Sequence, residues 1–252
     1  AKLDDGRTSS WQLVAIEYPH IEPQRVFPDA AARLVRIDLN RRGDHIGYMM
    51  GSGDQIPESL RQAGFDVALL SDADLERGTL AQYDAIVAGV RAYNTRDSLR
   101  TAHGRLMEYV EDGGTYVVQY NTATGFLNDD IAVPNIGPYP FRISRDRVAV
   151  ENAPVEILAP SHPVLTAPNR ITASDFEGWV QERGLYFPGE WDPKYETPIA
   201  SHDPGETAKP GGLLVARHGK GVFIYTGYSF FRQLPAGVPG AYRLFVNLVS
   251  AR

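Results

Sequence analysis

The segment YDAIVAGVRAYN at residues 83–94 and the segment GGTYVVQYN at residues 113–121 decide the fold. Each contains a short apolar run that is typical of a buried strand. An amphipathic helix is predicted between them, because four residues recur at helical spacing: Leu99, His103, Leu106 and Val110. The pair Gly113-Gly114 is expected to end this helix. The order strand, helix, strand predicts two parallel neighbouring strands.

The preceding part of the chain repeats this alternation. Asp54 is the expected N-cap of a helix that ends at Ala63, with Gly64 as its C-cap. We predict a strand at 46–50 and a glycine turn at 51–54, followed by that helix at 55–63. A second strand at 65–70 and a short helix or loop at 74–82 come next.

Beyond Asn121 the pattern changes to turn-forming residues and shorter strands. A strand or hairpin is predicted at 141–150, and a loop passes through Trp179, Tyr186 and Trp191. A short apolar run follows at 155–158, and three further strands are predicted at 198–201, 212–217 and 222–226. The turn His218-Gly219-Lys220-Gly221 joins the last two as a hairpin. A closing helix is predicted at 240–249, and three of its residues are expected to face the core: Leu244, Phe245 and Leu248.

These elements predict an α/β fold with three layers, a mostly parallel sheet of the flavodoxin-like type and a β-hairpin extension, over residues 45–252. Residues 1–44 differ, since strands are predicted at 11–18 and 33–39 with prolines between them. We predict that this part is a strand remnant or linker from a preceding β domain. The alternative is an edge addition to the main sheet.

Composition limits the classes of function. The 252 residues are 43% hydrophobic and carry a formal net charge of −6, which argues against nucleic acid and an anionic membrane as main partners. No apolar run approaches the ~20 residues that span a bilayer. The sequence has no cysteine, which excludes disulfides, thiolate zinc sites and a cysteine nucleophile. Its 13 Tyr, 10 Phe and 3 Trp suit carbohydrate or small polar ligands.

The order of segments resembles the class I glutamine-amidotransferase-like fold, in its ThuA-like branch. The points of resemblance are 83–87, 113–118, 161–165 and 215–226. Over almost the whole chain, a closer resemblance is to the C-terminal region of large bacterial PIG-L/LmbE-type deacetylases. The segments that carry it are 18–21, 46–48, 51–54, 89–94, 118–121, 202–206 and 231–244.

The resemblance implies a parent chain in which a zinc-dependent de-N-acetylase domain precedes β domains and an amidotransferase-like module. It therefore implies other domains of the same chain as partners, and a periplasmic or secreted location. The deacetylase signature Ala-His-Pro-Asp-Asp does not occur, and Ser161-His162-Pro163-Val164 lacks its acids. The amidotransferase cysteine expected after the strand that ends at 119–121 is also lacking. Neither activity is implied for these residues.

Polar and aromatic side chains follow the two central strands, where parallel sheets bind ligands. A guanidinium fork, amides and aromatic faces at this edge predict binding of a polar ligand. The predicted ligand-binding residues are Asp54, Arg91, Tyr93, Asn94, Gln119, Tyr120, Asn121, Arg232 and Gln233. The alternative is that these side chains tie loops together. We predict no catalytic residue, no cofactor and no metal.

The predicted function is a non-catalytic accessory module that binds glycan or another small polar ligand. One rival is a carbohydrate-active hydrolase that uses carboxylates among Asp175, Glu177, Glu190 and Asp203. A variant of it uses a metal held by His162, His202, Asp203 and Glu206. A second rival is a structural interdomain module. Nucleotide binding at the glycine turn is disfavoured, because Ile56 stands where the fingerprint needs a third glycine.

Overall fold

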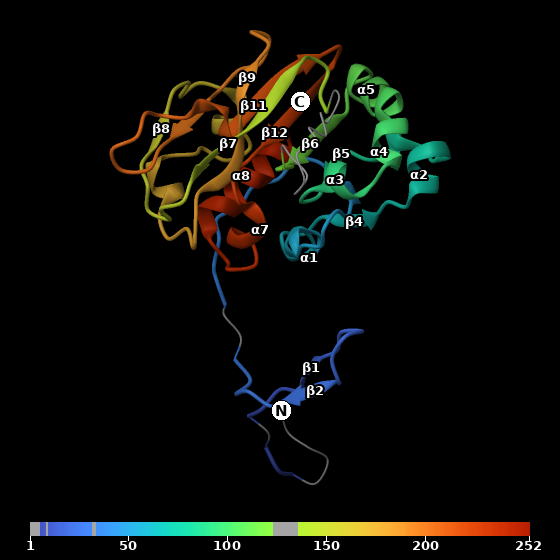
Figure 1. The fold of residues 1–252 in the computed structure, drawn as a ribbon, viewed down its shortest axis with the longest axis vertical. Coiled ribbons are helices and arrows are strands. Elements are labelled where there is room, and N and C mark those ends of the chain that lie inside the picture. Colours follow the sequence, from blue (N-terminus) through green and yellow to red (C-terminus); the bar gives the residue numbers. More distant parts are fainter. Residues whose placement is uncertain (1–5, 9, 32–33, 123–135) are drawn as a thin grey trace. The chain divides into compact units, whose positions relative to one another are not determined.

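The computed structural model describes residues 6–8, 10–31, 34–122 and 136–252 (Figure 1). It divides into two compact units, Ala1–Arg36 and Ile37–Arg252. Residues 37–44, which the sequence grouped with the N-terminal part, pack with the larger unit. The Asn40 N–H donates to Asn169 Oδ1 at 2.8 Å, and the Arg42 N–H donates to Ser250 Oγ at 3.2 Å.

The smaller unit contains an antiparallel pair of short strands, β1 (Val14–Ile16) and β2 (Gln24–Val26). The strand predicted at 33–39 is wrong, since residues 34–39 form no strand. The second strand lies instead in the proline-rich connection. The Ile21 N–H donates to the Tyr18 carbonyl at 3.2 Å and forms a turn between the two strands. The loop is short, so closing it costs little conformational entropy.

The larger unit is built on a six-stranded sheet with the order β11-β12-β6-β5-β3-β4. Its strands are β3 (His45–Met49), β4 (Asp66–Leu69), β5 (Ala85–Ala88), β6 (Thr115–Gln119), β11 (Leu213–His218) and β12 (Gly221–Thr226). All its pairings are parallel except β11–β12. Val87 of β5 lies opposite Val117 of β6, so the predicted parallel neighbours are confirmed. The predicted hairpin β11–β12 extends this same sheet.

Helices follow the strands. They are α1 (Ile56–Gln62), α2 (Asp72–Arg77), α3 (Ala92–Thr95), α4 (Ser98–Thr101), α5 (His103–Glu111), α6 (Pro163–Thr166), α7 (Phe230–Gln233) and α8 (Pro239–Val249). Short 3₁₀ turns are η1 (Leu80–Gln82), η2 (Ala173–Phe176) and η3 (Pro210–Gly212). The long helix predicted between β5 and β6 is interrupted at Ala102. Its predicted apolar face is buried all the same, at Leu99, Leu106 and Val110.

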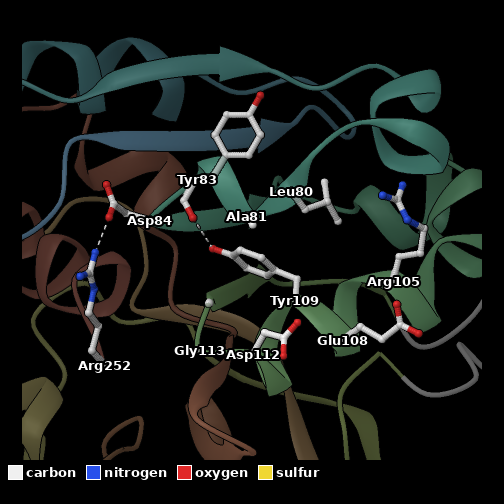
Figure 2. Close-up of a pocket in the computed structure, with 11 residues that line it drawn as sticks. Leu80, Ala81, Tyr83, Asp84, Arg105, Glu108, Tyr109, Asp112, Gly113 and Arg252 are labelled. Atoms are coloured by element: carbon white, nitrogen blue, oxygen red, sulfur yellow. Dashed lines mark hydrogen bonds and ion pairs between the residues drawn. The ribbon is translucent and has the colours of Figure 1, made fainter.

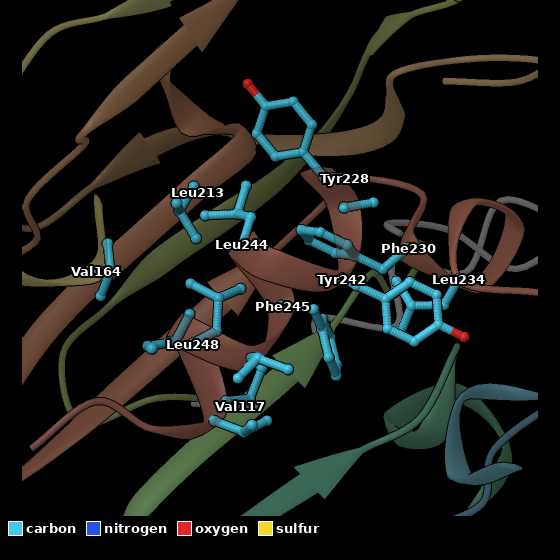
Figure 3. Packing of buried hydrophobic residues seen from close by; sticks show 14 of the residues in the cluster. Val117, Val164, Leu213, Tyr228, Phe230, Leu234, Tyr242, Leu244, Phe245 and Leu248 are labelled. Atoms are coloured by element: carbon cyan, nitrogen blue, oxygen red, sulfur yellow. The ribbon is translucent and has the colours of Figure 1, made fainter. Parts of the chain in front are cut away.

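Two apolar clusters make up the core of the larger unit. In the first, the inward residues predicted for α8, Leu244, Phe245 and Leu248, cluster with Val117 of β6 (Figure 3). The second includes Leu106 and Val110 of α5. The sheet is therefore covered on both faces, as the α/β prediction requires.

Two smaller antiparallel pairs complete the unit. They are β7 (Phe141–Val148) with β9 (Gly184–Trp191), and β8 (Val155–Ile157) with β10 (Ile199–Ser201). The loop predicted through Tyr186 and Trp191 is wrong, because both residues belong to β9. Its partner β7 is distant in sequence, so local periodicity gave no indication of this pairing. Over the described residues, no helix combines the length and apolar character needed to cross a membrane.

Candidate functional site

The loops after β5 and β6 lie against each other, as predicted. The backbone N–H of Arg91 donates to the Tyr120 carbonyl at 2.9 Å. The backbone N–H of Tyr93 donates to Asn121 Oδ1 at 3.0 Å. Asn94 and Thr122 exchange two hydrogen bonds, of 3.1 and 2.9 Å. These contacts bring five of the predicted residues to one edge of the sheet: Arg91, Tyr93, Asn94, Tyr120 and Asn121.

Some of these side chains are occupied by internal hydrogen bonds. Asn121 is fully buried, and its Nδ2 donates to the Gln119 carbonyl at 2.9 Å. The Tyr93 hydroxyl lies 2.9 Å from the Tyr116 hydroxyl, and burial raises the pKa of Tyr93. Together with Asn94, these residues hold the two loops in place, which is the alternative role that the sequence allowed.

Asp54 is also engaged by the protein. Its carboxylate accepts hydrogen bonds from the Tyr48 hydroxyl at 2.7 and 2.8 Å, from the Ile56 N–H at 3.0 Å and from the Val90 N–H at 3.2 Å. The N-cap of α1 is Gln55, so the prediction of Asp54 at that position is wrong by one residue. Burial, and next the negative charge of Asp54, raise the pKa of Tyr48 well above its usual range.

Two polar atoms at this edge have no hydrogen-bond partner within the described part of the chain. Gln119 is 1% exposed; its Nε2 donates to the Tyr48 hydroxyl at 2.9 Å, and its Oε1 is buried with no hydrogen bond. The Nε of Arg91 is likewise buried and unpaired. Buried polar atoms are satisfied in the great majority of cases, so each exception calls for an explanation.

The backbone of Arg91 is unusual as well. Arg91 adopts φ 56° and ψ 26°, a left-handed conformation that is uncommon outside glycine. Its N–H is held by Tyr120, and its carbonyl accepts from the Asn94 N–H at 2.9 Å and from Thr95 Oγ1 at 3.1 Å. A strained residue fixed from both sides at a strand end is typical of functional sites.

Aromatic rings adjoin the two loops. Tyr120 stacks on Tyr186 with ring centroids 6.0 Å apart at 9°, and contacts Phe231 at 5.4 Å. Tyr186, like Arg91, has a positive φ, of 53°. Burial raises the pKa of Tyr120, and the positive charges of Arg91 and Arg232 oppose this shift. The sequence did not single out Tyr186 or Phe231, because no local pattern places them beside Tyr120.

The two residues predicted on α7 differ in their surroundings. Arg232 is half-buried and donates to Glu182 Oε1 at 2.7 Å and to Gln181 Oε1 at 2.5 Å. Gln233 is fully buried, and its amide bonds the backbone N–H and carbonyl of Val180 at 2.8 and 2.9 Å. Gln233 therefore anchors α7, whereas Arg232 lies near Tyr120 through Phe231, over whose ring it sits at 4.9 Å.

Two of the carboxylates named for the hydrolase alternative serve local structure. Asp203 accepts from the N–H groups of Ala149 and Val150, both at 2.9 Å. Asp175 accepts from Arg243 Nε at 2.8 Å and closes a capping box with Thr172. Within the described ranges, no three His, Asp or Glu side chains converge as a metal site would require.

Two cavities lie elsewhere in the larger unit. One, of about 410 Å³, is at the amino ends of β5 and β6 and is shown in Figure 2. There the Tyr109 hydroxyl donates to the Tyr83 carbonyl at 3.0 Å, and Arg252 pairs with Asp84. The other, of about 420 Å³, is lined by His103, Met107, Gly137, Pro138, Tyr139, Pro140 and His218. The sequence predicted neither.

Comparisons with known proteins give the fold. No family model and no curated protein matches the chain. Among solved structures, a cytoplasmic protein of Salmonella typhimurium LT2 has a TM-score of 0.51 at 14% identity, over 82% of this chain and 100% of that one. The β-galactosidase of Rahnella sp. R3 has a TM-score of 0.50 at 13% identity, over 81% of this chain. The chain spans only 30% of that enzyme.

A putative ThuA-like protein of Bacteroides uniformis is also among the neighbours, with a TM-score of 0.48, 16% identity and coverage of 87% of this chain and 95% of that one. Likeness at such low identity concerns the fold alone. The observed sheet confirms an α/β fold with a mostly parallel sheet, and the Salmonella match agrees with it. The matches carry no information about ligand or activity.

Proposed function

We propose that this chain is a non-catalytic, ligand-binding module of the ThuA-like type within a larger PIG-L/LmbE-type deacetylase. Its ligand is a glycan or a related small polar molecule, bound at the carboxyl ends of β5 and β6. The observation that carries the proposal is a pair of buried polar atoms, Gln119 Oε1 and Arg91 Nε, that form no hydrogen bond with any residue described by the structure. They belong to the same loops as the Tyr120–Tyr186 stack.

Energetics support a binding role for this edge. An unsatisfied buried polar group costs about 1–3 kcal/mol, and a left-handed non-glycine residue costs about 1–3 kcal/mol more. The protein maintains both features within a few residues. A ligand that accepts hydrogen bonds from the half-buried Arg91 recovers part of this energy, which gives the strain a function.

The non-catalytic part of the proposal is supported by the sequence. The amidotransferase reaction needs a cysteine, and this chain has none. The carboxylates of Asp54, Asp175 and Asp203 are each bonded to backbone N–H groups. The match to the Rahnella β-galactosidase covers 30% of that enzyme. It is a precedent for a domain of this fold as one part of a longer chain that acts on carbohydrate.

A glycan array with the purified chain tests the proposal. We expect a defined set of glycans to be retained, and Arg91→Ala to lose at least about tenfold in affinity for them, the effect of one charge-assisted hydrogen bond. The control is Arg77→Ala, since Arg77 is an exposed residue at the carboxyl end of α2, on the way to the amino end of β5.

Both variants should unfold at the same temperature as the wild type. Retention of no glycan at all, or equal loss in the two variants, contradicts the assignment. In that case the internal bonds of Asn94, Asn121 and Gln233 favour the structural interdomain module instead.

A further inference from the structure

The arginines of the strand-end site differ in how their charge is neutralised. Arg232 is paired with the Glu182 carboxylate at 2.7 Å. Arg96, on the same side of the domain after α3, forms an ion pair with Asp72 and donates to the Leu70 carbonyl at 3.2 Å. Arg91 alone of these three has neither an ion pair nor a side-chain hydrogen bond to any residue that the structure describes.

The charge of Arg91, which no described residue pairs with, is partly removed from water. Arg91 is half-buried, and its Nε is fully buried. Its positive charge acts on Tyr120, where it opposes the rise in pKa that burial causes. Glu182 is the acid that acts on the same ring, and it is already bonded to Arg232. Asp54, the acid of the neighbouring turn, has its oxygens occupied by Tyr48 and two backbone N–H groups.

The position of Arg91 is fixed rather than flexible at its backbone. Bonds from Asn94 and Thr95 to its carbonyl, and from its own N–H to Tyr120, hold the left-handed conformation. A guanidinium on a rigid backbone loses less conformational entropy when it binds a ligand, which favours a directed, bidentate contact. Carboxylates and phosphates both match this fork geometry, and a carboxylate carries the single negative charge that one guanidinium balances.

We infer that the ligand of this site carries a carboxylate, and that it is an acidic sugar of the uronic-acid class, with the carboxylate on Arg91 and the sugar ring beside Tyr120 and Tyr186. The inference rests on the proposed function and narrows its ligand. The half-buried ring of Tyr186, stacked on the buried ring of Tyr120, supplies apolar surface for the C–H groups of a pyranose. One guanidinium that forms no ion pair with a described residue balances one carboxylate, so the bound pair carries no net charge.

The test changes the ligand before it changes the protein. Calorimetric titration compares uronic-acid oligosaccharides with the same oligosaccharides after chemical reduction of their carboxyl groups, which leaves linkage and length unaltered. We expect the acidic form to bind at least about tenfold more tightly. The preference should weaken only modestly between low and high salt, since it comes from one partly buried charge pair, which salt screens less than an exposed pair.

Two variants then locate the contact. Arg91→Gln should abolish the preference for the acidic form while leaving weak binding of the reduced form, and Arg91→Lys should restore only part of it, because an ammonium lacks the fork. Equal binding of acidic and reduced oligosaccharides overturns the carboxylate inference but leaves a glycan site standing. Binding of neither form, with no other glycan retained on the array, overturns the proposed function as well. A preference that survives Arg91→Gln places the carboxylate elsewhere and also overturns the inference.

Discussion

Removal of the Tyr48 hydroxyl tests the buried chain of hydrogen bonds that supports the site. Tyr48 is fully buried in β3, donates to Asp54 and accepts from Gln119 Nε2. The substitution Tyr48→Phe keeps the ring and deletes only the oxygen. Asp54 retains its bonds from Ile56 and Val90, whereas Gln119 is left with no partner on either atom of its side-chain amide.

The expected loss follows from these contacts. A hydrogen bond to a charged group contributes about 1.5–3 kcal/mol, and a newly unsatisfied buried donor costs about 1–3 kcal/mol. The two terms share one site and are not additive. We therefore expect Tyr48→Phe to lower the free energy of unfolding by about 2–4 kcal/mol.

Urea unfolding, followed by the fluorescence of the buried Trp179, measures this change. The control is Tyr242→Phe: Tyr242 is 6% exposed, and its hydroxyl has no hydrogen bond in the described structure. It should change stability by less than about 0.5 kcal/mol. If the two variants are equally stable, the hydrogen-bonded chain from Asp54 to Gln119 contributes nothing, and our reading of this edge is wrong.

Further predictions concern a glycine and a histidine. Gly114→Ala should destabilise the fold by about 2 kcal/mol or more, since the new Cβ would lie 2.2 Å from the Tyr109 ring. Gly104→Ala should stabilise it by about 0.4–1 kcal/mol, because nothing in the described structure lies within 4 Å of a Cβ at this position on α5. Thermal unfolding of the two variants measures both changes. Burial lowers the pKa of His162 below its usual 6.5, so the unfolded state binds more protons than the native state. The free energy of unfolding should therefore fall as pH is lowered from about 7.5 to about 5.5, and less so in His162→Gln; identical pH slopes would refute this role.

The sequence by itself determined the central sheet. Strands buried on both faces appear as continuous apolar runs, and 85–88 and 115–118 could be recognised from them. The glycines at 113 and 114 end α5 for reasons local to the chain: Gly113 has φ 121°, and Gly114 has no room for a side chain. Because parallel strands end at one edge, the meeting of Arg91 with Tyr120 could also be predicted.

Only the tertiary structure decided which of these side chains are free and what surrounds them. Asn121 and Gln233 read as ligand-binding amides, yet the chain consumes them internally. Tyr186 and Phe231 reach Tyr120 from β9 and α7, and neither the β7–β9 pairing nor the left-handed backbone of Arg91 leaves a periodic trace in the sequence. Periodicity reports the face of an element that is buried; contacts between distant segments depend on packing, which a single sequence does not encode in any local pattern.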